Sequence, residues 1–117
     1  MVVEDEGVVS IDIRNILKNA GYSIAAVAFQ GDEAVEKAEM AAPDLILMDI
    51  GLKGEIDGIE AAKRIRDRFQ IPVVFLTGFA DEVTMAKARE VNPSGFIIKP
   101  INEEELKKTL DDILRKT

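Results

Sequence analysis

Short apolar segments alternate with longer stretches of helical periodicity five times along the chain, and this alternation constrains the fold more than any other feature. The apolar segments cover residues 1–3, 22–29, 45–48, 73–76 and 95–98. Three of them contain the unbroken runs Leu-Ile-Leu-Met, Val-Val-Phe-Leu and Phe-Ile-Ile, which are typical of parallel strands covered on both faces. The pattern therefore predicts an α/β fold, a doubly wound (βα)5 arrangement of a five-stranded parallel sheet with helices on both faces.

Helix signals lie between the predicted strands. We predict helices ending before Gly21, over about 32–42, from Asp57 to about 69, over about 81–91, and from Asn102 almost to 117. Asp57 and Asn102 each have a glutamate three residues later, which is the capping-box pattern of a helix start.

The helix predicted over 81–91 has the weakest apolar face. Its inward residues are expected to be mostly Val83, Ala86 and Val91, which are small or few for a helix of this length. We therefore expect this helix to be weakly anchored on the sheet.

Composition excludes several kinds of chemistry. The 117 residues include no cysteine and no histidine, which excludes disulfides, thiolate nucleophiles, imidazole bases and a phosphohistidine on this chain. The 22 acidic and 15 basic side chains give a net charge of −7, which argues against direct binding of nucleic acid. The apolar runs are too short to span a membrane, and the acidic start is unlike a signal peptide. We expect one cytoplasmic domain over 1–117, with no output domain.

Polar side chains follow the predicted strands where each strand ends. Glu4 and Asp5 follow the first strand, Asp49 the third, Thr77 the fourth and Lys99 the fifth. Ligands of open parallel sheets bind at these carboxyl ends. Several carboxylates in one pocket repel one another unless a cation lies between them, and oxygen ligands favour a hard ion such as magnesium. With a lysine and a hydroxyl nearby, this set of groups suits phosphoryl transfer onto a carboxylate.

Each of these residues also has an ordinary structural interpretation. Glu4 and Asp5 are acceptable caps for the first helix, and Asp49 and Lys99 are acceptable loop residues. Phe96, in the last strand, is an ordinary core residue unless other evidence gives it a role. Residues with unrelated structural roles would not all be expected at the carboxyl ends of the predicted strands, however. We therefore favour the functional interpretation of these residues as a group.

Five motifs in order resemble the receiver domain of response regulators in two-component signalling. They are Val-Glu-Asp-Glu at 3–6, Leu-Met-Asp-Ile at 47–50, Asp-Gly at 57–58, Ile-Pro-Val-Val-Phe-Leu-Thr at 71–77 and Gly-Phe-Ile-Ile-Lys-Pro at 95–100. The resemblance covers the whole chain. It implies the flavodoxin-like strand order 2-1-3-4-5, and a signalling switch that is not a turnover enzyme on an external substrate.

The resemblance also implies roles for the acidic residues. Asp49 would be the phosphoacceptor. Asp5 would ligate magnesium directly, Glu4 mostly through a bound water, and the main-chain carbonyl of Gly51 would complete the protein ligands. Lys99 would pair with the phosphoryl oxygens.

The switch and its partners follow from the same resemblance. Thr77 would move toward the phosphoryl group, Phe96 would follow it inward, and the peptide before Pro100 is expected to be cis. The donor would be a histidine kinase or phosphotransfer protein. A downstream protein would bind the face formed by the fourth helix, fifth strand and fifth helix of a monomer or weak dimer.

The sequence departs from the family pattern in one loop, and three alternative functions remain to be weighed. The loop at 51–56 reads Gly-Leu-Lys-Gly-Glu-Ile, which is one residue longer than usual in the family and lacks its proline. A haloacid-dehalogenase-type phosphatase would need an acid where Gly51 stands, and a flavodoxin-like FMN binder would need a Ser/Thr-rich loop after the first strand. A pseudo-receiver that serves only as a protein-interaction module stays open as the main alternative.

Overall fold

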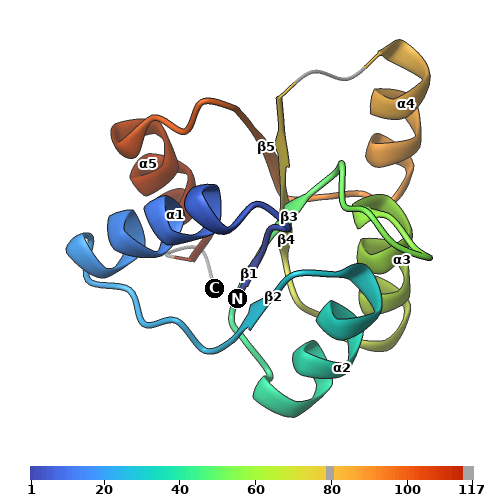
Figure 1. Ribbon diagram of the computed structural model, residues 1–117, viewed down its shortest axis with the longest axis horizontal. Helices are drawn as coiled ribbons and strands as arrows, with labels where there is room; N and C mark the ends of the chain where they lie inside the picture. The colour runs from blue at the N-terminus through green and yellow to red at the C-terminus, as the bar shows by residue number, and fades with distance from the viewer. Residues whose placement is uncertain (79–80, 115–117) are drawn as a thin grey trace.

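A five-stranded parallel sheet lies between two layers of helices in the computed structural model, which describes residues 1–78 and 81–114 (Figure 1). The strand order is β2-β1-β3-β4-β5, so the predicted fold class and order are confirmed. In chain order the elements are β1 (Val2–Val3), α1 (Gly7–Asn19), β2 (Val27–Ala28), α2 (Gly31–Ala41), β3 (Ile46–Asp49), α3 (Gly58–Arg68), β4 (Val73–Thr77), α4 (Glu82–Glu90), β5 (Gly95–Ile98) and α5 (Glu103–Leu114).

The sheet has a hydrophobic core on each face. Helices α1 and α5 cover one face, and α2, α3 and α4 cover the other (Figure 1). Alternate residues of β3 enter different cores: Ile46 and Met48 pack under α2 and α3, whereas Leu47 packs under α1 and α5. The continuous apolar runs of the central strands are explained by this burial on both sides.

Strand β2 is much shorter than predicted. The sequence predicted a strand over 22–29, but only Val27–Ala28 is paired. Its one neighbour is β1, whose two residues pair as Val2↔Val27 and Val3↔Ala28, so the segment before Val27 has no strand beside it. The prediction was wrong because an edge strand extends only as far as its neighbour supplies hydrogen bonds.

At both predicted helix starts, the capping side chain accepts the expected hydrogen bond. Asp57 accepts a hydrogen bond from the backbone N–H of Glu60 at 2.9 Å, and Asn102 accepts one from Glu105 at 3.0 Å. The end of the last predicted helix, residues 115–117, lies outside the described residues.

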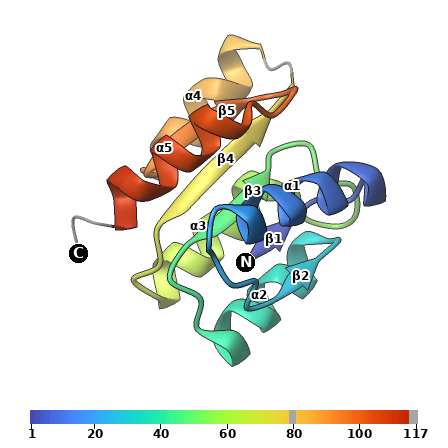
Figure 2. The ribbon, with the colours of Figure 1, turned by 90° about the vertical axis from the view of Figure 1, so that its left-hand side faces the viewer.

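Helix α4 presents a different face to the core from the one predicted. Val83 is 65% exposed and Ala86 is also exposed, so both inward assignments were wrong. Ala88 is the buried residue of this helix, and Met85 and Val91 pack partly against the core. Only the small side chain of Ala88 is fully buried in α4, which agrees with the expected weak anchorage of this helix. The helix also lies at the margin of the molecule (Figure 2).

Candidate functional site

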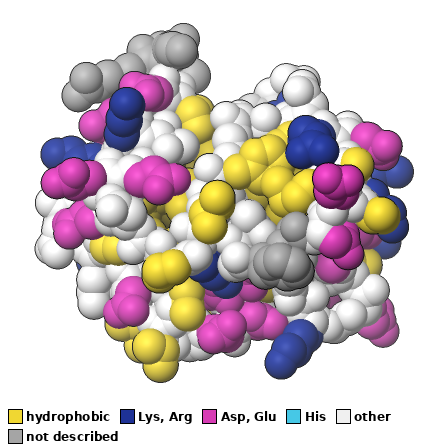
Figure 3. Space-filling model, turned by 90° about the horizontal axis from the view of Figure 1, so that it is seen from above, with side chains coloured by type: hydrophobic (Ala, Val, Ile, Leu, Met, Phe, Trp, Pro, Cys, Tyr) yellow, Lys and Arg dark blue, Asp and Glu magenta, His cyan; other side chains and the backbone are white. Residues whose placement is uncertain are grey.

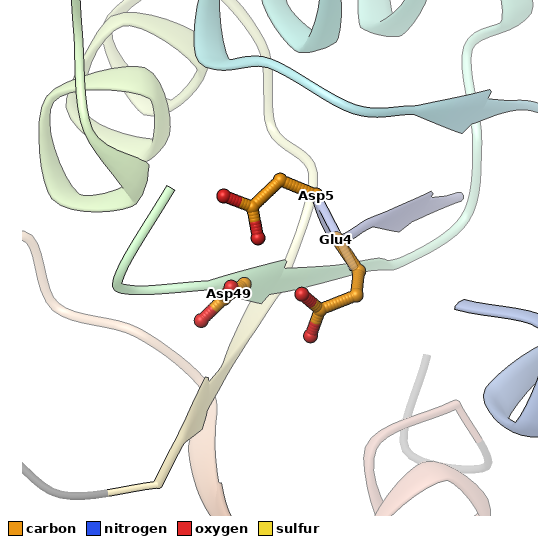
Figure 4. A group of neighbouring side chains, drawn as sticks. All are labelled: Glu4, Asp5 and Asp49. Atoms are coloured by element: carbon orange, nitrogen blue, oxygen red, sulfur yellow. The ribbon is translucent and has the colours of Figure 1, made fainter. Parts of the chain in front are cut away.

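Three carboxylates converge at the carboxyl ends of β1 and β3. The two strands are neighbours in register, with Val3 beside Met48, so Glu4 and Asp5 come to lie next to Asp49. One oxygen from each carboxylate lies within 4.8 Å of the others (Figure 4). The predicted clustering is therefore present in the structure.

Lys99 lies against this cluster from β5. Its Nζ is 2.6 Å from Glu4 Oε1 and 3.4 Å from Asp49 Oδ1. The backbone of Lys99 is held by an N–H hydrogen bond to the Thr77 carbonyl at 2.8 Å, so β4 and β5 place its side chain. Burial opposes the charged form, but contacts with Glu4 and Asp49 outweigh that effect and raise the pKa of the ammonium. The Lys99–Pro100 peptide is cis, as expected.

Glu4 is an ionisable side chain with no exposed surface. This burial raises its pKa from 4.5 to about 7, opposed by the contact with Lys99 and by a hydrogen bond from the Glu6 N–H to Oε2 at 3.1 Å. The neighbouring Asp49 raises it further. Contact with Lys99 therefore does not fully offset the cost of a charged Glu4 at this position, and an added cation would favour the charged form.

The donor atoms of the cluster fit a hard divalent ion. The three groups offer carboxylate oxygens only, and magnesium prefers such ligands, usually keeping several waters. Gly51 lies two residues beyond Asp49, and its N–H donates to Asp49 Oδ1 at 3.0 Å. The use of the Gly51 carbonyl as a ligand stays a prediction.

The structure rules out the capping interpretation of the first acids. Helix α1 has Glu6 as its N-cap residue, and no side chain caps it. Glu4 turns back to the Glu6 N–H, while Asp5 accepts a hydrogen bond from the Lys53 N–H at 3.2 Å. Both acids are therefore held as members of the site.

Thr77 and Phe96 lie on the neighbouring strands β4 and β5. Thr77 is 7% exposed and lines a hollow of about 380 Å³ together with Asp49. Phe96 is half-buried and packs on Phe75, with ring centroids 5.9 Å apart. The core interpretation of Phe96 holds in this conformation, and its movement as a switch stays a prediction.

Sequence reasoning missed several residues around this hollow. Asp81 and Thr84 line it at the start of α4, and Asp57 lines it in addition to capping α3. Asp81 also accepts a hydrogen bond from the Thr84 N–H at 2.7 Å. Their position after strand ends was a usable signal for Asp57 and Asp81, but both were assigned only to helix starts.

Comparison with known proteins agrees with this geometry. The family model for the response regulator receiver domain matches residues 1–111. The chain belongs to the response regulator receiver family. The receiver domain is the signalling module of two-component systems, and it is not a classical enzyme acting on an external substrate.

The chain is also similar to two transcriptional regulatory proteins. The transcriptional regulatory protein PdtaR of Mycobacterium tuberculosis is 35% identical over 106 residues, which cover 91% of this chain and 51% of PdtaR. The alkaline phosphatase synthesis transcriptional regulatory protein PhoP of Bacillus subtilis is 31% identical over 118 residues, or 100% of this chain and 48% of PhoP. This receiver chain thus spans about half the length of these relatives.

A solved receiver domain has nearly the same backbone. The signal receiver domain of a modulated diguanylate cyclase from Desulfovibrio desulfuricans matches with a TM-score of 0.93 and 34% identity, covering 98% of this chain and 91% of that one. Among the described residues of our receiver, no helix is long and apolar enough to cross a membrane.

Proposed function

We propose that this receiver accepts a phosphoryl group on Asp49 and thereby changes the surface that it offers to a partner. The observation that carries the proposal is the position of the Lys99 ammonium, in contact with both Glu4 and Asp49 at the acidic edge of the sheet. The co-location of Asp49, Lys99 and Thr77 supports phosphate acceptance over a pseudo-receiver that only binds proteins.

The chemistry assigned to the chain is transfer from a phosphohistidine of a histidine kinase or phosphotransfer protein in the cytoplasm. An Asp49 carboxylate oxygen attacks phosphorus, a P–O bond forms, and the P–N bond breaks to return the imidazole to the donor. Lys99 holds positive charge beside the phosphoryl oxygens, and the Thr77 hydroxyl donates a hydrogen bond to one of them. Asp5, Asp49 and the Gly51 carbonyl, with Glu4 acting through water, would hold magnesium, which would supply further positive charge to the site. Later hydrolysis of the aspartyl phosphate resets the switch.

The partner surface is assigned to α4, β5 and α5. The α4 residue Val83 and the β5 residue Ile98 are 65% and 64% exposed. Viewed from the end of the molecule that carries α4, hydrophobic side chains lie at the surface between charged ones (Figure 3). A weakly anchored α4 beside Thr77 is a suitable element to move when that threonine shifts toward the phosphoryl group.

Hydrogen exchange with the phosphate mimic beryllofluoride tests the proposed switch. With magnesium and beryllofluoride, we expect amide protection to change several-fold across residues 77–101, because β5 and the start of α4 adjoin Thr77. Protection should stay the same in α2, which packs on β2 and α3. The Asp49→Asn variant should show no such change. Unchanged protection across 77–101 in the wild-type chain would contradict the proposed movement.

A further inference from the structure

The loop between β3 and α3 contacts the acidic cluster through its backbone. At the tip of this loop, the N–H of Lys53 donates a hydrogen bond to Asp5 Oδ2 at 3.2 Å. The lysine side chain itself is exposed, so the contact does not depend on its charge. The residue in contact with the site is 48 positions from Asp5 in the chain.

Apolar residues fasten the loop on both sides of this amide. Leu52 is 5% exposed and belongs to the core under α2 and α3, and Ile56 packs partly against the same core. Between Lys53 and Ile56, Gly54 adopts a φ of +116°, a conformation that side chains other than glycine rarely adopt. The turn is therefore built to return to the core within a few residues.

Helix α2 holds the far side of the loop. A Cβ atom on Gly31, the first residue of α2, would lie 2.7 Å from Ile56 Cγ1 and 2.8 Å from the Ile56 carbonyl oxygen. Such distances are shorter than any real contact, so Ile56 occupies the space that a side chain at position 31 would need. The absence of a side chain at Gly31 thus lets the loop lie directly against α2.

We propose that the Lys53 amide is a positioning group for the metal ligand Asp5. A hydrogen bond to one oxygen of a carboxylate sets the rotation of the group and leaves the other oxygen for the cation. The packing of Leu52 and Ile56 against the core holds the loop so that this amide reaches Asp5. This inference rests on the proposed magnesium site, and it adds to that site a backbone N–H donor that none of the site's side chains supplies.

Magnesium titration by calorimetry tests the role of this amide. Lys53→Pro removes the N–H and should weaken magnesium binding by about 10- to 100-fold, as loss of a partner of a metal ligand generally does. Lys53→Ala keeps the N–H and should bind magnesium within about twofold of the wild-type chain, because only the exposed side chain is lost. Equal affinities of Lys53→Pro and wild type would overturn the proposal.

A second pair of variants covers the case in which Lys53→Pro does not fold, which thermal unfolding would show. Ile56→Ala loosens the loop but retains every backbone donor, and it should weaken magnesium binding. Ile56→Val keeps most of the apolar side chain and should bind magnesium with an affinity near that of the wild type. Unchanged affinity of a folded Ile56→Ala variant would also overturn the proposal. If the wild-type chain itself bound no magnesium, the proposed function would fail first, so the two failures are distinguishable.

Discussion

Replacing Lys99 by alanine is expected to lower the free energy of unfolding by about 2–4 kcal/mol at pH 8 and by less than half of that at pH 5. The ammonium contacts Glu4, which is fully buried, and Asp49, which is 5% exposed. Its removal at pH 8 leaves the two carboxylates beside each other without a balancing charge. We expect a smaller loss of stability than for breaking a fully buried ion pair, because the Lys99 side chain is 19% exposed.

The pH dependence follows from Glu4. Its pKa is raised from 4.5 to about 7 in the folded state, so between these values the folded chain binds more protons than the unfolded chain. The free energy of unfolding therefore decreases as pH rises through this window. Loss of Lys99 removes an effect that lowers the pKa of Glu4, which extends the same decrease to higher pH.

Urea unfolding in EDTA at both pH values measures the effect. Lys108→Ala is the matched control, since Lys108 is an exposed lysine of α5 and its loss should change stability little at either pH. Equal destabilisation of Lys99→Ala at pH 5 and pH 8 would show that Lys99 does not balance Glu4.

Substitution of Gly58 by alanine should have a comparably large effect, about 3 kcal/mol or more. A Cβ atom at this position would lie 2.0 Å from the Asp49 carbonyl oxygen and 2.9 Å from its carbonyl carbon. Both are backbone atoms, so the start of α3 and the end of β3 must separate to admit a methyl group. Because Asp49 lies on the strand that moves, magnesium affinity should fall together with stability.

Gly7→Ala is the matched control for this substitution. Gly7 is also the first residue of a helix, but a Cβ atom there would have nothing within 4 Å. Its replacement should change the free energy of unfolding by about 0.5 kcal/mol or less in either direction. Chemical denaturation of both variants makes the comparison. Near-wild-type stability of Gly58→Ala would mean that α3 does not start directly against the Asp49 backbone.

The fold and the position of the site could be predicted because both depend on the order of elements. Unbroken apolar runs identified the buried strands β3 and β4, and right-handed crossovers then placed their carboxyl ends at one edge. Asp49 and Lys99 follow such strands directly, so their meeting required no knowledge of side-chain conformation. The capping residues Asp57 and Asn102 act on their own helices and were equally accessible to sequence reasoning.

The features that escaped prediction depend on what lies beside a segment in space. The length of β2 is set by β1, and no pattern within 22–29 reports that its neighbour has two residues. The predicted face of α4 was wrong because Val83 is more apolar than Ala88, yet the helix turns Ala88, Met85 and Val91 toward the core and leaves Val83 exposed. The Lys53 amide carries no sequence signal, since every residue except proline has such a donor.

Incubation with acetyl phosphate and magnesium, followed by intact-mass analysis, tests the phosphoacceptor assignment most directly. The wild-type chain should gain one phosphoryl group, and it should gain none in EDTA. Asp49→Asn should gain none under either condition, although its fold should be retained because asparagine has the same shape as aspartate. No adduct on the folded wild-type chain, or an equal adduct on Asp49→Asn, would contradict the assignment of Asp49 as the phosphoacceptor.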